Sequence, residues 1–307
     1  RGGTSGHCAF YGANASGFTL EDIEVSNVSG AGMNLQGASG FLVTHCEVHD
    51  TGADGIHMPK TVRNAVVQAC ETYATGDDGI SVVGLREGGV NAVPSGIKII
   101  GCNVRDGHSR GITVIGGDQV SVLACTVYDC QVGGIWFNSE SAYDTHAVTN
   151  CTAAFNTLAR IGRTARTGHT GTFGAIISVR GRTGYRNSNI KLIGNTVKDC
   201  SGINATTGAA ASCNLVSVAN TDGIEITHNT LDGTPTGADI NRTIRWGVFE
   251  DTTNITLDKN TCTACNQIGV FLDADCDGWF DATGNKFTDA AISGGYPVIQ
   301  VDSTTMM

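Results

Sequence analysis

The most constraining feature of the sequence is a cysteine that recurs in five consecutive segments, each time with an isoleucine ten residues later. The same register extends to Ile23 before the cysteines and to asparagines after them. Such a period predicts stacked copies of one supersecondary unit. We call the recurring places the ladder positions, and they are predicted at Ile23, Cys46, Cys70, Cys102, Cys125, Cys151, Asn195, Asn229, Asn260 and Asn285.

Apolar residues alternate with polar ones around each ladder position, as they do in β-strands. Around Cys46, for example, Phe41 and Val43 precede it, Val48 follows it, and Ile56 lies further on. This period of two predicts three short strands in every repeat. Pairing of each strand with its counterpart in the next repeat gives three parallel sheets. The predicted class is all-β, a right-handed single-stranded parallel β-helix of about ten rungs.

The repeats run through the whole chain, so we expect residues 1–307 to form one elongated domain, with a change of character after residue 188. Stacked repeats exceed the usual domain length because each rung adds its own core. The chain begins at RGGTSGHCAF without a segment that would cap an open sheet edge, so we expect a longer polypeptide. No apolar run approaches the length of about 18 residues that spans a membrane.

The 12 cysteines could form disulfides, bind metal or pack as small apolar side chains. Cysteines at ladder positions would stack inside the helix, which favours buried thiols. Cys262 and Cys265 form a CxxC motif, but no second pair stands at a zinc-like spacing. We therefore predict no structural metal, and a row of hydrogen-bonded amides at the later ladder positions.

The net charge of −10 and the pI near 5.1 argue against a nucleic-acid partner. Charge is uneven, however, because one stretch rich in Gly and Thr holds six arginines and no Asp or Glu. This stretch is either a solvated loop or a basic wall that attracts an anionic substrate. In the second case Arg160 and Arg163 are the expected substrate-binding residues. The six are Arg160, Arg163, Arg166, Arg180, Arg182 and Arg186.

Ionisable residues recur just before the third strand of successive repeats. Asp54, Asp78 and Arg110 each lie eight residues after a ladder cysteine, with Asp77 beside Asp78 and His108 near Arg110. Rungs stack about 4.8 Å apart, so these side chains should form a column. Like charges this close raise the pKa of one carboxyl while another stays ionised, which is what glycosidic hydrolysis needs. The alternative is ordinary Asp-Gly turn chemistry.

A second column should face outward from the third strand, one place after each inward residue. Its polar members suit a sugar chain that lies along the helix axis, and its indole could stack on a pyranose ring. The alternative is a solvated sheet face without a ligand. The column consists of Asn34, His57, Ser81, Thr113 and Trp136.

The succession ADGIHM, GDDGISV and RGITVIG resembles the NTD, GDD, GHG and RIK motifs of the polygalacturonase type of glycoside hydrolase, over roughly residues 40 to 165. The whole chain is similar, more loosely, to pectate-lyase-like proteins and to the β-helical depolymerase domains of bacteriophage tailspikes. The resemblance implies that Asp78 protonates the leaving oxygen while Asp54 and Asp77 activate water. It also implies inversion, whereas a one-rung carboxylate separation of about 5 Å is nearer the retaining range.

The chain departs from the polygalacturonase motifs in three places. NTD reads Gly-Ala-Asp, the family's histidine falls at Arg110 with His108 two residues earlier, and Arg160-Ile161 is followed by Gly162 instead of Lys. Galacturonate as the substrate does not follow from these motifs. The third strand after Cys151 can be read either at Arg160-Ile161-Gly162 or at GAIISVRG, residues 174 to 181, which would leave Arg160 in a loop.

Three functions therefore compete. The first is a glycoside hydrolase of an acidic or complex polysaccharide, which needs no metal or cofactor. The second is a polysaccharide lyase in which Asp54, Asp77 and Asp78 hold Ca²⁺ and Arg110 is the base. The third is a non-catalytic binding or structural module of a phage tail fibre. The tailspike resemblance implies an extracellular or virion-associated protein that forms a homotrimer.

Overall fold

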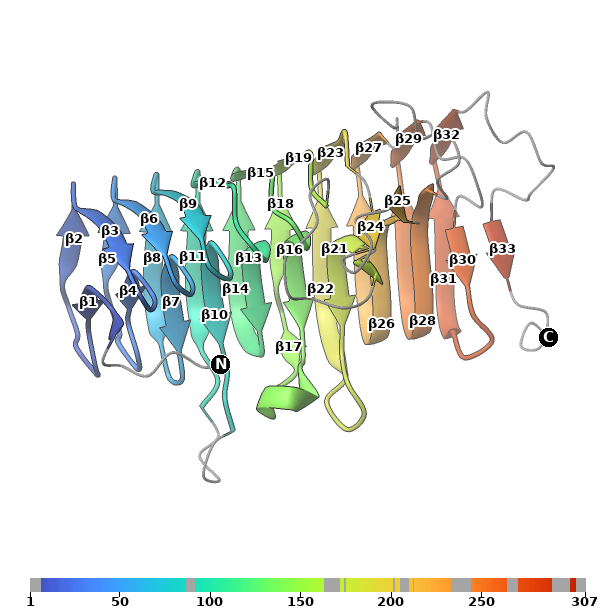
Figure 1. Cartoon of the computed structure of the whole chain (residues 1–307). Helices are drawn as coiled ribbons and strands as arrows, with labels where there is room; N and C mark the ends of the chain where they lie inside the picture. Colours follow the sequence, from blue (N-terminus) through green and yellow to red (C-terminus); the bar gives the residue numbers. More distant parts are fainter. Residues whose placement is uncertain are drawn as a thin grey trace.

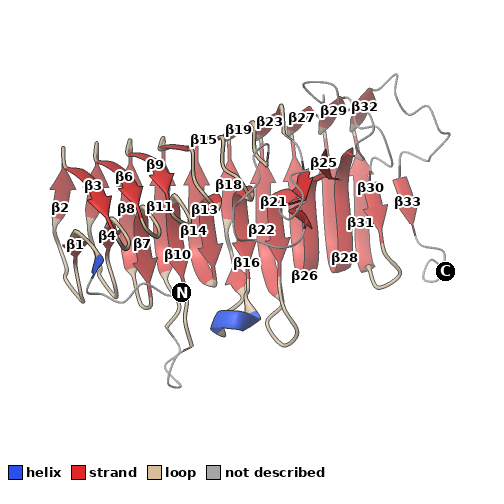
Figure 2. Ribbon diagram, viewed as in Figure 1, coloured by secondary structure: helices blue, strands red, loops and turns tan. Residues whose placement is uncertain are grey.

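The computed structural model describes residues 7–86, 92–162, 172–173, 175–200, 202–204, 210–211, 213–232, 244–263, 270–288 and 299–301. Strands stack along one axis into an elongated body, from β2 at one end to β33 at the other (Figure 1). The connections are loops and turns, among them the 3₁₀ turn η3 (Ser141–Tyr143) (Figure 2). The predicted all-β parallel β-helix is confirmed. No helix among these residues is long and apolar enough to cross a membrane.

Each rung contributes one strand to each of three parallel stacks, as the alternation predicts. The second stack is a separate sheet of ten strands, which gives ten rungs in the described residues. It comprises β3 (Glu24–Val28), β6 (Glu47–Thr51), β9 (Glu71–Thr75), β12 (Asn103–Arg105), β15 (Thr126–Tyr128), β19 (Thr157–Ala159), β23 (Thr196–Lys198), β27 (Thr230–Asp232), β29 (Thr261–Thr263) and β32 (Lys286–Thr288).

The first and third stacks are joined, because β26 (Cys213–Thr227) and β28 (Ile244–Asp258) run through the corner between them. The first stack otherwise comprises β2 (Thr19–Glu21), β5 (Leu42–Thr44), β8 (Arg63–Gln68), β11 (Ser95–Ile100), β14 (Gly117–Leu123), β17 (Val148–Thr149), β18 (Thr152–Ala154), β22 (Asn187–Ile193) and β31 (Asp277–Thr283). The third comprises β1 (Phe10–Tyr11), β4 (Met33–Asn34), β7 (Ile56–Pro59), β10 (Ile80–Val83), β13 (Arg110–Ile115), β16 (Gly133–Asn138), β21 (Ala175–Arg180), β30 (Val270–Leu272) and β33 (Ile299–Val301).

A small antiparallel sheet is inserted beside the stacks, and the sequence gives no signal for it. It consists of β20 (Thr172–Phe173), β24 (Gly202–Asn204) and β25 (Ala210–Ala211). Its strand β24 contacts β26. The parallel pairing itself runs on through residue 188, because β22 pairs with β18 on one side and with β26 on the other.

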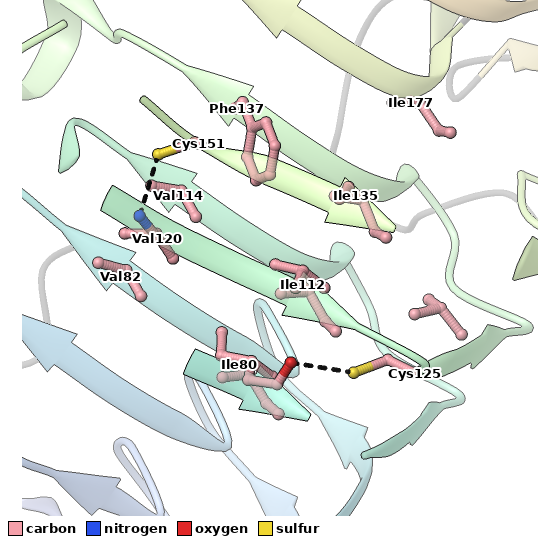
Figure 3. Close-up of a cluster of buried hydrophobic side chains, with 14 of the residues drawn as sticks. Ile80, Val82, Ile112, Val114, Val120, Cys125, Ile135, Phe137, Cys151 and Ile177 are labelled. Atoms are coloured by element: carbon pink, nitrogen blue, oxygen red, sulfur yellow. Dashed lines mark hydrogen bonds between the residues drawn. The ribbon is translucent and has the colours of Figure 1, made fainter. Parts of the chain in front are cut away.

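Left-handed backbone conformations turn the corners of the helix. The residue before each ladder position has a positive φ, a conformation that Gly, Asn and Asp adopt at least cost. The inward side chains of β10, β13 and β16 are apolar and fully buried. Ile80, Ile112 and Ile135 stack on one another in register (Figure 3). Burial of each such side chain contributes roughly 1.5–3 kcal/mol.

The ladder prediction is wrong at one rung, where Asn156 takes the place assigned to Cys151. Thr157 pairs with Thr126, and the backbone N–H of Cys125 donates to Asn156 Oδ1 at 2.8 Å. Cys151 lies at the other end of the core, where its Sγ accepts the N–H of Val120 (Figure 3). Both positions point inward, so the spacing alone could not separate them. The third strand of this rung is β21, which leaves Arg160 in a turn, the second of the two predicted alternatives.

The cysteines are mostly buried free thiols, as predicted. Burial raises the pKa of Cys130 and of Cys151 to about 12, which makes them poor nucleophiles. Cys262 differs from the prediction because it is disulfide-bonded. The side chain of its partner lies outside the described residues.

Candidate functional site

The candidate site lies at the turns that lead into β7, β10 and β13. The inward isoleucines of these strands pair in register, and Asp54, Asp78 and Arg110 each lie two positions before them. These side chains therefore form one column. Asp77 joins it, because one oxygen from each of the three aspartates lies within 4.8 Å of the other two.

Asp78 is the most buried of the three carboxylates, with 3% of its surface exposed. Arg110 donates to Oδ1 from Nε at 2.8 Å and from its backbone N at 3.2 Å, and to Oδ2 from Nη2 at 2.8 Å. Thr113 Oγ1 also donates to Oδ2, at 2.9 Å. Burial raises the pKa of Asp78, and Arg110 opposes the rise by stabilising the charge. All four lone-pair positions are engaged, so Asp78 holds Arg110 and has no position left for a substrate.

Asp54 is held as a carboxylate by donors from two rungs. Its Oδ1 accepts the backbone N–H of Asp78 at 3.1 Å, and its Oδ2 accepts Ser81 Oγ at 2.5 Å and lies 2.6 Å from His57 Nδ1. Burial raises the pKa of Asp54, but the hydrogen bonds and the charge of His57 outweigh burial, and the net pKa is lowered. Asp54 therefore favours the ionised form.

Asp77 has the opposite character. Burial raises its pKa, and the charges of Asp78 and Asp54 raise it further, while Arg110 and a hydrogen bond with Ser109 oppose the rise only in part. Its side chain is half-buried. The cluster therefore contains one carboxyl that favours its proton and, within 4.8 Å, another that favours ionisation.

Arg110 links the aspartates to a residue that sequence reasoning missed. Its Nη1 donates to Glu140 Oε1 at 2.6 Å, and its Cζ lies 5.1 Å from the centre of the Trp136 ring. Burial lowers the pKa of Arg110, but Asp78 and Glu140 outweigh burial and raise it above its ordinary value. Glu140 follows the strand GGIWFN after one serine, so the turns after the third strands were the place to search.

The outward column of the third stack forms in the predicted register, but most of it does not face solvent. Ser81 and Thr113 have no exposed surface, because they lie beneath the carboxylates that they hydrogen-bond. Asn34 is also buried. His57 and Trp136 are half-buried. Of the predicted substrate-binding residues in this column, only these two present surface to a ligand.

His108 and Arg160 lie at a different place from the carboxylates. Both line a hollow of about 520 Å³, together with Asp50, Ala74, Asp106, Asp129 and Gln131. Arg160 forms an ion pair with Asp129, with 2.5 Å between Nη2 and Oδ2. The predicted grouping of His108 with Arg110 is thus not observed. Arg163 lies outside the described residues.

The arginine-rich stretch does not form an unpaired basic wall where it is described. Each of its four described arginines has a carboxylate partner from another part of the chain. The separation in sequence reaches 70 residues for Arg180 and Glu250. The pairs are Arg160 with Asp129, Arg180 with Glu250, Arg182 with Asp144 and Arg186 with Asp251.

The aspartate cluster does not fit Ca²⁺, which takes six to eight oxygen ligands. Asp78 is saturated by four hydrogen bonds, and Asp54 accepts from Ser81 and Asp78 while pairing with His57. A calcium ion would have to displace these protein donors. No step of the chemistry is therefore assigned to a metal here.

Three solved structures place the fold among known proteins. The A-module of the Azotobacter vinelandii mannuronan C-5 epimerase AlgE4 has a TM-score of 0.60 at 11% identity, over 95% of this chain and 76% of that one. The catalytic unit of a GH87 α-1,3-glucanase from Streptomyces thermodiastaticus strain HF3-3 has a TM-score of 0.58 at 16% identity, over 91% of this chain and 50% of that one. PfbA, a surface adhesin of Streptococcus pneumoniae, has a TM-score of 0.56 at 10% identity, over 95% of this chain and 62% of that one.

These identities establish likeness of fold alone. The chain spans half the length of the glucanase unit. Comparison of the sequence with curated proteins finds no match. The model of the right-handed β-helix region matches residues 3–92 and 88–243, which is most of the chain. The chain therefore belongs to the right-handed parallel β-helix family.

Proposed function

We propose that this protein is a glycoside hydrolase that cleaves a polysaccharide. The observation that carries the proposal is the pair of opposed pKa shifts on neighbouring carboxyls, downward at Asp54 and upward at Asp77. Two titratable groups pushed apart in this way are the usual arrangement for acid and base roles in one site. The relatives in fold include proteins named for α-1,3-glucan and for mannuronan, which supports a polysaccharide as the substrate class.

In the proposed reaction, Asp77 gives its proton to the glycosidic oxygen as the bond to the anomeric carbon breaks. One oxygen of Asp54 lies within 4.8 Å of one oxygen of Asp77. This is nearer the carboxyl separation of roughly 5–5.5 Å in retaining enzymes than that of roughly 6.5–9.5 Å in inverting ones, so the Asp54 carboxylate attacks that carbon. Asp77 then takes a proton from water, the water oxygen bonds to the anomeric carbon, and Asp54 leaves. The sum is the addition of one water across one glycosidic bond.

This assignment moves the acid role from Asp78, where the polygalacturonase resemblance puts it, to Asp77. The reason is that Asp78 has every acceptor position filled by Arg110 and Thr113. His57 keeps its predicted contact with the sugar, because its Nδ1 faces Asp54 and its ring is 24% exposed. We place the protein outside the cell or on a virion, where such substrates occur.

The lyase alternative loses support from the same geometry. Its base would be Arg110, but this guanidinium is bound on both sides by carboxylates, and they raise its pKa. A general base needs a pKa lowered toward the working pH. Its metal would be Ca²⁺, which the saturated carboxylates do not fit.

The test is product analysis by mass spectrometry after incubation with α-1,3-glucan, alginate and polygalacturonate. Hydrolysis gives products one water heavier than the anhydro repeat, and Asp77→Asn is expected to lower the rate by about 10²–10⁴-fold. Asp222→Asn is the matched control, because Asp222 is an aspartate that accepts hydrogen bonds from Thr253 and Asn254 and lies far along the helix. Unsaturated products would establish a lyase. Binding without any product, unchanged in Asp77→Asn, would establish a binding module.

A further inference from the structure

A line of ion pairs crosses the outer face of the third stack. It begins at Asp78, before β10, continues through the guanidinium of Arg110 at the start of β13, and ends at Glu140, beyond the end of β16. The line therefore runs from the edge where the strands begin to the edge where they end. Its two later members are largely covered, with 14% of the Arg110 side chain and 24% of the Glu140 side chain exposed.

Trp136 lies beneath this line and gives it support. The ring folds back over the first residue of its own strand, since a Cβ on Gly133 would collide with Nε1 of the indole. Nε1 donates to the carbonyl of Ala175 at 3.2 Å, and Arg110 lies over the ring. The indole is thus fixed on two sides. One face is occupied by Arg110, so it is not the open stacking platform that the sequence suggests.

The turn that carries Glu140 is also held in place. The backbone N–H of Glu140 donates to Thr145 Oγ1 at 2.7 Å, and the N–H of Thr145 returns to the carbonyl of Glu140 at 3.1 Å. Arg182 donates to the carbonyl of Thr145 and to Asp144. Glu140 is therefore positioned before any ligand arrives, and little ordering remains to be done.

We propose that the Arg110–Glu140 pair is a bar that ends the polysaccharide-binding surface, so that the enzyme acts at chain ends. The inference rests on the proposed function and specifies its substrate as a polymer terminus. A chain that lay along the helix axis would meet this bar one rung past Asp78, and crossing it would separate two largely buried charges. Removal of one partner from such a pair is costly, and a built-in obstacle of this kind selects one binding mode over another.

The polymer would therefore occupy the side where Asp54 and His57 lie. Beyond the bar, the inserted sheet contacts β26 through β24. An internal segment of a polymer needs room on both sides of the cleaved bond, whereas a terminal segment needs room on one side only. This asymmetry is the reason to expect release of short products from chain ends.

The test compares the loss of viscosity with the number of reducing ends formed on whichever of the three polymers is cleaved. The wild type is expected to form reducing ends with little loss of viscosity. Glu140→Ala should raise the viscosity loss per reducing end about tenfold. Arg110 keeps its bonds to Asp78 in this variant, so the site stays assembled. Glu250→Ala, which removes another Arg–Glu partner outside the site, should leave the ratio unchanged. A wild type that cuts internal bonds would overturn the proposal.

A second measurement needs no substrate and separates failure of the bar from failure of the proposed function. Acrylamide quenching of tryptophan fluorescence should rise in Glu140→Ala, because the Arg110 guanidinium over Trp136 loses one of the two carboxylates that hold it. The rise should vanish in the Trp136→Phe background, which isolates this indole from the others. If quenching does not change on removal of Glu140, no bar covers Trp136, whatever the protein cleaves. If it rises but no polymer is cleaved, the bar stands and the proposed function fails.

Discussion

The two halves of the helix fill the same corner with different chemistry. In the first half, the thiol of Cys46 donates to the carbonyl of Leu20 at 3.6 Å. In the second half, Nδ2 of Asn229 donates to the carbonyl of Leu192 at 2.8 Å. Both carbonyls lie three places before the ladder position of the preceding rung. The ladder side chain also accepts the backbone N–H of the preceding ladder residue, which is Ile23 in the case of Cys46.

A thiol thus performs the two hydrogen-bonding tasks of an amide, with weaker bonds. The amide adds a third contact, since each Asn Nδ2 also reaches the Oδ1 of the next, as between Asn229 and Asn260 at 2.9 Å. The lesson is that backbone geometry defines the ladder position, and residue type follows it loosely. The candidate site lies in the cysteine half, where the turn before the third strand is short and places the ionisable residues in register.

The largest expected difference in the free energy of unfolding is between variants that remove an ion pair in each half. Arg110→Ala should destabilise the protein by about 3–5 kcal/mol, because it leaves the buried carboxyl of Asp78 without a charged partner. Arg180→Ala removes an exposed pair with Glu250 and should cost about 0–1 kcal/mol. Denaturant unfolding of both variants measures the difference. Equal losses would contradict the assignment of Asp78 as a buried carboxylate.

The next largest difference in the free energy of unfolding is expected between variants of the asparagine ladder and of the cysteine ladder. Asn229→Ala should cost about 2–5 kcal/mol, since it strips the N–H of Asn195 and other buried groups of their partners. Cys102→Ala removes one sulfur with weak bonds and should cost about 1 kcal/mol. The free energy of unfolding gives both values. If the cysteine variant lost as much as the asparagine variant, the thiol ladder would be stronger than its 3.6 Å contacts indicate.

The smallest effect concerns pH. Asp77 has a raised pKa in the fold, so its favourable contribution is present at low pH and is lost as pH rises through the folded value. Asp77→Asn should therefore stabilise the protein at neutral pH, with a gain that disappears in acid. Asp54 has a lowered pKa, so Asp54→Asn should be destabilising at neutral pH and lose that effect as pH falls. Thermal unfolding across pH separates the two signs.

The period of the sequence predicted the stacks, the rungs and the column of Asp54, Asp78 and Arg110, because parallel in-register pairing repeats every offset. It failed where two inward positions compete, as with Cys151 and Asn156. It could not predict partners from distant segments. Glu140 lies 30 residues from Arg110 and outside the repeated pattern. The arginine-rich stretch looked unpaired because its carboxylates come from other rungs.

Asp77 is expected to keep its proton to a higher pH than an ordinary aspartate, while Asp54, beside it, is expected to ionise at a lower one. The direct measurement is a carboxyl ¹³C NMR titration of the aspartates in the wild type, with Asp77→Asn and Asp54→Asn to assign the signals. We expect the signal lost in Asp77→Asn to titrate above the ordinary range for aspartate, and the signal lost in Asp54→Asn to titrate below it. The reverse order, or two signals within the ordinary range, would contradict it.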